Sequence, residues 1–118
     1  MASKLEVTKE EMGDIVVFSV KGAVDAATVN TFDGVLGPAF RSRNVRGVVD
    51  CSQVTYICSH AMGLLIEYHR QSCLGTGRIV VCAPSRSVAS SLKRLRIDAI
   101  LTVVPTRADA LEELAAQG

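Results

Sequence analysis

The stretch VVDCSQVTYICSHAMGLL, residues Val48–Leu65, decides the fold of this chain. It opens with β-branched and apolar residues, which predict a buried central strand over Val45–Cys51. From Ser59 onward the apolar residues recur at helical spacing, so a helix is expected from Ser59 to about Cys73. A serine hydroxyl can accept a hydrogen bond from a first-turn amide, which makes Ser59 the expected N-cap. The same position favours an anion, because it lies at the positive end of the helix dipole.

Strand-like and helix-like segments alternate on both sides of this stretch. Asp25 is expected to be the N-cap of the first helix, and Gly37-Pro38 should kink that helix or end it early. The order β-β-α-β-α-β-α-β-α predicts an α/β fold, with a mixed, largely parallel sheet and about four helices. The other expected elements are a strand around Leu5 and Val7, a strand over Ile15–Lys21, a helix from Asp25 to about Ser42, a strand over Arg78–Ala83, a helix opening at Pro84-Ser85, a strand over Ala99–Val104 and a helix after Pro105-Thr106.

Length and composition narrow the class of protein. The 118 residues are expected to form one domain, 1–118, and the hydrophobic content of 48% supports a buried core. A net charge of +1 gives no indication that the chain binds nucleic acid. No apolar run approaches the ~20 residues that a membrane helix needs, and the first residues lack a secretory signal, so no membrane insertion is expected. The four cysteines lack zinc spacing and fit a reducing cytoplasm, and we expect no metal or cofactor.

Three segments together resemble the STAS domain, the fold of bacterial anti-sigma factor antagonists. The first is VKGAVDAATVNTF, Val20–Phe32, which is similar to the family's strand, Asp-containing turn and helix. The second is the central stretch, which resembles its strand and Asp-Ser-Ser/Ala-Gly-hydrophobic-Gly motif. The third is IVVCAPSRSVASSLKRLRIDAILTVVPTRADALEEL, Ile79–Leu114, which looks like the closing strands and helices. The order and spacing of the three segments carry the resemblance across nearly the whole chain.

The resemblance implies a non-enzymatic switch that works by binding a protein. Family members bind an anti-sigma factor that is also a serine kinase. The kinase phosphorylates a serine at the start of the family member's second helix, and the complex then dissociates. Aligned on the motif, that phosphoacceptor is Ser59. The motif's Asp, second Ser and first Gly are Cys58, His60 and Ala61 here, whereas Gly63 matches.

The expected partner-binding residues surround this serine. They are Asp25, whose loop lies beside the acceptor in the family, and Cys58, His60 and Met62. We expect His60 and Met62 to be exposed, because an exposed methionine suits an adaptable apolar contact.

Other functions remain open at this point. The chain could be a STAS interaction module of a stressosome or a transporter complex, without phosphorylation. Cys58 and His60 could form a catalytic nucleophile, or they could bind a metal ion together with His69. Alternatively, Cys58 is a small side chain that fills space where the family usually carries Asp, and His69 is a structural, partly buried histidine. The basic third helix is either a solvated face or a docking face for an acidic protein; its charged residues are Arg86, Lys93, Arg94 and Arg96.

Overall fold

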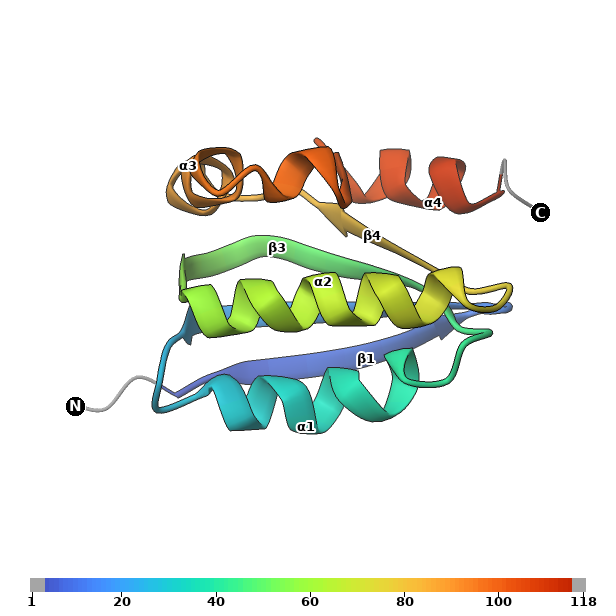
Figure 1. Ribbon diagram of the computed structural model, residues 1–118, viewed down its shortest axis with the longest axis horizontal. Coiled ribbons are helices and arrows are strands. Elements are labelled where there is room, and N and C mark those ends of the chain that lie inside the picture. The colour runs from blue at the N-terminus through green and yellow to red at the C-terminus, as the bar shows by residue number, and fades with distance from the viewer. Residues whose placement is uncertain (1–3, 116–118) are drawn as a thin grey trace.

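A computed structural model describes residues 4–115 as a five-stranded sheet packed against helices (Figure 1). The strand order is β1-β2-β3-β4-β5, so each strand pairs with its neighbours in sequence. This architecture confirms the predicted α/β class and element order. The elements are β1 (Glu6–Met12), β2 (Ile15–Val24), α1 (Val29–Phe40), β3 (Arg46–Ile57), α2 (Ser59–Cys73), β4 (Arg78–Cys82), α3 (Arg86–Arg94), a 3-10 turn (Ile97–Ala99), β5 (Thr102–Val104) and α4 (Arg107–Ala115).

The sheet is parallel except at its first pair. β1 and β2 form an antiparallel hairpin in which Met12 pairs with Ile15, and Gly13 takes the positive φ of 68° that the tight turn requires. The pairs β2–β3, β3–β4 and β4–β5 are parallel. Parallel neighbours need crossover connections, and α1, α2 and α3 supply them.

Side chains that alternate along the strands build two cores, one on each face of the sheet. On β2, Phe18 and Val20 point into the larger core with α1, α2 and α3, whereas Val17 points into the smaller core beneath α4. In Figure 1, α1 and α2 lie side by side, and they also pack against each other. The smaller core consists of Val17, Val48, Val80, Cys82, Ala110 and Leu114.

The first helix begins later than the sequence predicts. Its N-cap is Thr28 and not Asp25, whose side chain instead accepts hydrogen bonds inside the turn that precedes α1. α1 continues through Gly37 and Pro38 and ends at Phe40, so these two residues do not end the helix early.

The central strand is longer than expected. Ser52-Gln53 does not leave the sheet, and β3 continues to Ile57 alongside β2, with register shifts in their pairing near Val20 and Gly22. β4 pairs only with Arg46–Asp50, so the last part of β3 extends beyond it. There, the hydroxyls of Ser85 and Ser87 donate to the Val54 and Thr55 carbonyls at 2.8 and 3.1 Å.

Two glycines allow close approach of two loops at the opposite edge of the sheet. The amide of Gly77 donates to the Arg43 carbonyl at 2.7 Å. A Cβ on Gly77 would lie 2.5 Å from the carbonyl oxygen of Val45, and a Cβ on Gly75 would lie 2.6 Å from that of Arg43. Backbone atoms cannot move away as the end of a side chain can, so both positions require glycine.

We therefore expect Gly77→Ala to lower the free energy of unfolding by about 1–3 kcal/mol, as overpacking does in a well-filled site. Gly34→Ala is the matched control. Gly34 lies in α1 with open space where its Cβ would be, so alanine should stabilise the chain by about 0.5–1 kcal/mol. Urea unfolding of both variants checks this, and equal effects would contradict the close-approach explanation.

Candidate functional site at the start of α2

The candidate site lies where β2 and β3 end side by side. The last strand pair is Val24 with Ile57, and the amide of Cys58 then donates to the Val24 carbonyl at 2.8 Å. This bond places the Asp25 turn beside the first residues of α2. Asp25, Cys58 and Ser59, which the sequence analysis singled out, therefore lie at one edge of the sheet.

Ser59 is the first residue of α2 and is exposed, but it is not the N-cap. The N-cap is Cys58, which has extended backbone angles, and within residues 4–115 no side chain caps this helix. A thiol is a weak acceptor, so Cys58 cannot replace the carboxylate or hydroxyl that usually binds first-turn amides. α3 differs, since the Ser85 hydroxyl accepts from the Val88 amide. The Ser59 hydroxyl is thus accessible at an uncapped helix N-terminus.

Asp25 organises the neighbouring turn. Its Oδ1 accepts from the amides of Ala27 and Thr28 at 2.9 and 3.1 Å. The Thr28 hydroxyl donates to the Ala23 carbonyl at 2.7 Å and accepts from the Asp25 amide at 2.9 Å. Asp25 remains half-buried, and its Oδ1 is bound to the turn.

The expectation that Met62 is exposed is wrong. Its side chain is only 3% exposed and belongs to the larger core. The buried stripe of α2 starts at Ala61 and Met62 and continues through Leu65 and Tyr68, because residues three to four apart share a helix face. His60 is exposed as expected, and Cys58 is half-buried against the larger core.

Tyr56 is an exposed aromatic residue that the sequence analysis did not select. Its neighbours Val54 and Ile57 point into the larger core, whereas Tyr56 is 52% exposed near the end of β3. Its strand partner is Ala23, two residues before Asp25. Strict alternation from the buried Val54 would turn Tyr56 inward, but the register shift between Gly22 and Ala23 skips Thr55 and turns Tyr56 outward, so the sequence pattern alone does not select it.

The geometry does not assemble a thiol nucleophile around Cys58. Among the described residues, no hydrogen bond joins Cys58 to His60; the thiol–imidazole contact present is Cys73 with His69, at 3.6 Å. Burial raises the pKa of Cys51 to about 12 and that of Cys82 to about 11, so both thiols stay protonated at neutral pH. No cluster of three His, Cys, Asp or Glu side chains that could hold a metal ion occurs between residues 4 and 115.

A polar network of Asp33, Arg41 and Tyr68 holds α2 against α1. The hydroxyl of the buried Tyr68 donates to Asp33 Oδ1, and the Arg41 guanidinium donates to both Asp33 oxygens at 2.8 and 3.1 Å. Burial acts to raise the pKa of Asp33, but the hydrogen bonds from Tyr68 and Arg41 outweigh it and hold the pKa below its usual value. Nearby His60 acts in the same direction. The orientation of α2, and hence of Ser59, is therefore tied to α1.

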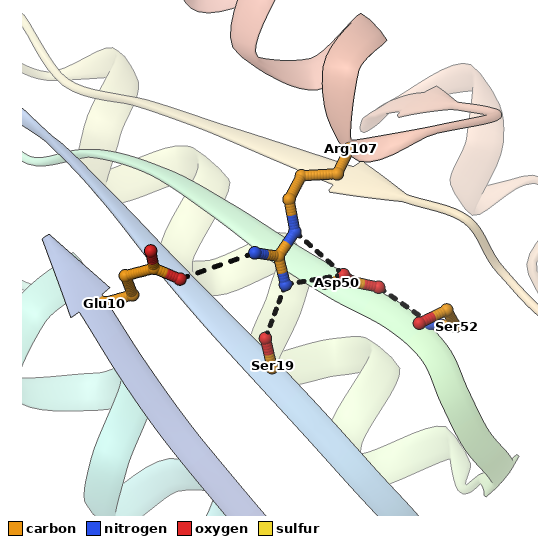
Figure 2. A network of polar contacts seen from close by, with 5 residues as sticks. All are labelled: Glu10, Ser19, Asp50, Ser52 and Arg107. Atoms are coloured by element: carbon orange, nitrogen blue, oxygen red, sulfur yellow. Dashed lines mark hydrogen bonds and ion pairs between the residues drawn. The ribbon is translucent and has the colours of Figure 1, made fainter. Parts of the chain in front are cut away.

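A second network joins α4 to the first three strands (Figure 2). Arg107 donates from Nε and Nη2 to Asp50 Oδ2 at 3.1 and 2.9 Å, and from Nη2 to the Ser19 hydroxyl at 2.7 Å. Its Nη1 lies 3.5 Å from Glu10 Oε1. Burial acts to raise the pKa of Asp50, but hydrogen bonds from the Ser52 amide and Arg107 outweigh it and hold the pKa below its usual value.

The comparisons with known proteins agree with this architecture. The family model of the STAS domain matches residues 6–110. The chain belongs to the STAS domain family. No curated protein matches its sequence.

Solved structures share the fold at low sequence identity. An anti-sigma factor antagonist from Mycobacterium paratuberculosis is 21% identical with a TM-score of 0.86, and the match covers 95% of each chain. An anti-sigma-factor antagonist (STAS) domain protein from Planctomyces limnophilus is 18% identical with a TM-score of 0.69, covering 94% of this chain and 97% of that one. The phosphorylated form of the Bacillus cell fate determinant SpoIIAA is 18% identical with a TM-score of 0.66, covering 96% and 99%.

The STAS fold places the two motif segments of the sequence at one edge. The Val20–Phe32 segment supplies the Asp25 turn, and the central stretch supplies Cys58, Ser59 and His60. Between residues 4 and 115, no helix of this STAS domain has both the length and the apolar character needed to cross a membrane.

The Asp50–Arg107 pair gives a testable pH dependence. Asp50→Asn should lower the free energy of unfolding by about 1–3 kcal/mol at neutral pH, because it weakens a charged hydrogen bond. The folded pKa of Asp50 is depressed, so its stabilisation is present above about pH 4 and is lost as the pH falls through the folded value. The difference between the variant and the wild type should therefore shrink in acid.

Urea unfolding at a series of pH values measures that difference. Asp98→Asn is the control, since Asp98 is exposed in the 3-10 turn and should change stability by less than about 0.5 kcal/mol. A loss at Asp50 that stays constant into acid would contradict the ion-pair account.

Proposed function

We propose that this STAS domain is a cytoplasmic regulator of the anti-sigma factor antagonist type. It binds an anti-sigma factor that is also a serine kinase, and phosphorylation of Ser59 ends the binding. The observation that carries this proposal is the exposed Ser59 hydroxyl at the uncapped start of α2, beside the Asp25 turn. A kinase can reach this hydroxyl without unfolding the helix.

The uncapped first turn allows the domain to tolerate a phosphate. Phosphorylation adds about −1.5 to −2 charges and three strong acceptor oxygens. The free first-turn amides and the dipole of α2 favour an anion there by about 0.3–1 kcal/mol at an exposed site. On a partner surface that fits the neutral hydroxyl, by contrast, the new charge would be desolvated and repelled. Phosphorylation is therefore expected to weaken binding while leaving the fold intact.

The residues that differ from the family motif change the charge and the helix capping around Ser59. Cys58 replaces the motif's Asp, which removes both a helix cap and a negative charge next to Ser59. His60 follows Ser59 and is exposed, so it replaces the motif's second Ser at the surface next to the phosphoacceptor. Ala61 is fully buried, so the motif's Gly position contacts the core and does not face the partner.

Tyr56 is the aromatic anchor of the proposed partner surface, together with Asp25, Cys58, Ser59 and His60. Tyrosine is enriched among interface hot spots, because it buries a large area with few rotatable bonds. Tyr56 is half exposed on the rigid end of β3, whereas Met62, which the sequence suggested for such a contact, is buried.

A constitutive interaction module without phosphorylation is the second candidate. The replacement of three motif residues around Ser59, by Cys58, His60 and Ala61, favours it, since these positions flank the residue that a kinase would recognise. Both candidates act by protein binding and not by catalysis.

The deciding experiment is incubation with the anti-sigma factor kinase from the same genome and ATP, followed by mass spectrometry. We expect a single phosphate on Ser59 and weaker binding of the modified domain. Ser59→Ala should bind the kinase but stay unmodified, and its stability should change by less than about 0.5 kcal/mol, because Ser59 is not a cap. A phosphate on another serine, or none, leaves the constitutive module as the function.

Tyr56→Ala should weaken binding of the same partner by about 2 kcal/mol or more, as truncation of a hot-spot residue does. Leu74→Ala is the matched control, because Leu74 is 63% exposed but follows the far end of α2. Calorimetric titration of both variants measures the effect. Equal affinities for the two variants would remove Tyr56 from the partner surface.

A further inference from the structure

The surface of α3 and the 3-10 turn carries a concentration of positive charge in an almost neutral chain. Residues 86–100 contain four cations and one carboxylate, Asp98, so this segment has a charge of +3 while the whole chain has +1. The rest of the chain therefore has a net charge of −2. We call this segment's exposed part the α3 basic surface; it consists of Arg86, Lys93, Arg94 and Arg96 with the exposed apolar residues Leu95 and Ile100.

The cations of the α3 basic surface form no ion pairs within residues 4–115, although Lys93 and Arg94 in the last turn of α3 interact favourably with its helix dipole. Elsewhere in the described chain, Arg41, Arg46, Arg78 and Arg107 form ion pairs, whereas Arg43 and Arg70 form none. Within residues 4–115, none of the four cations of the α3 basic surface pairs with a carboxylate. Their charges are available to another molecule.

Two of these arginines occupy positions that local stability disfavours. Arg86 is the first residue of α3, where the positive end of the helix dipole repels a cation. Arg96 follows α3 with a φ of +59°, in the left-handed region where glycine or asparagine is favoured. Residues that oppose local preferences are expected mainly at functional sites. Helix stability therefore does not account for Arg86 and Arg96.

The apolar residues of the surface define the kind of partner. Leu95 and Ile100 are 48% and 47% exposed, while Val88 and Leu92 on the inner side of α3 are buried in the larger core. An amphipathic helix whose apolar face is already buried cannot insert that face into lipid. Residues 86–100 contain no aromatic side chain for stacking on nucleic-acid bases. Exposed aliphatic side chains among guanidinium groups suit carboxylates interspersed with apolar side chains.

We propose that the α3 basic surface docks an acidic protein segment that also carries apolar side chains. Arginine guanidinium groups bind carboxylates through paired hydrogen bonds, and Leu95 and Ile100 contact the apolar side chains. This docking surface does not include Ser59 and does not depend on phosphorylation. The Ser87–Thr55 hydrogen bond holds the start of α3 against the end of β3, so the surface is presented on a rigid element.

The test uses the whole chain and a short fluorescent peptide of Glu and Asp with interspersed Leu, measured by anisotropy. Arg86→Glu/Arg94→Glu should weaken binding by about tenfold or more, and Leu95→Ser should weaken it as well. Arg43→Glu/Arg70→Glu makes the same change in net charge at exposed arginines outside the surface, and should retain the wild-type affinity within about twofold. The affinity should fall with added salt, and replacing the peptide's Glu and Asp by Gln and Asn should abolish binding.

Thermal unfolding of each variant confirms that the fold is kept. Equal losses in the two double variants would mean attraction by net charge alone and would overturn the proposal. Absence of peptide binding would overturn it too. Tighter binding to phosphatidylglycerol vesicles or to a DNA duplex than to the peptide would assign the surface to a membrane or to nucleic acid instead.

Discussion

The parallel pairing of β2 with β3 is the constraint on which the site depends. It runs from Ile15 beside Arg46 to Val24 beside Ile57, and the Cys58–Val24 hydrogen bond continues it into the first turn of α2. The turn of Asp25 and the start of α2 leave adjacent strands at the same edge, so their separation is set by backbone hydrogen bonds and not by flexible loops. A site built on strand ends keeps its geometry when its side chains change, which agrees with three altered motif positions around Ser59 in an intact fold.

Local patterns in the sequence were sufficient for most of the fold. The bounds of α2, Ser59–Cys73, follow from apolar residues at helical spacing, and the first hairpin follows from the turn at Gly13. The length of β3 could not be predicted in this way. Ser52 and Gln53 suggest a turn when read locally, but both are exposed residues of a strand that has already passed the end of β4.

The site was predicted in part. The exposure of Ser59 and His60 was correct, while the position of the site and the roles of Asp25, Cys58, Ser59 and His60 in partner binding stay predictions. The errors at Ser59 and Met62 have different causes: the N-cap position falls on Cys58, whereas Met62 shares a buried helix face with Leu65. Hydrogen bonds between residues far apart in the chain could not be predicted, because residue spacing does not show that Asp50 pairs with Arg107 or Tyr68 with Asp33. An aspartate inside an apolar strand does indicate that some cation lies nearby.

The hydrogen bonds from Ser85 and Ser87 to β3 limit how another chain can bind at this end of the sheet. A strand that projects beyond its neighbour offers backbone groups to which another chain could add a strand of its own. Ser85 and Ser87 occupy the carbonyls of Val54 and Thr55, so an incoming strand would first have to break both bonds. Side chains therefore dominate recognition at this end of the molecule, and specificity can be altered by substitution while the backbone edge stays protected from aggregation.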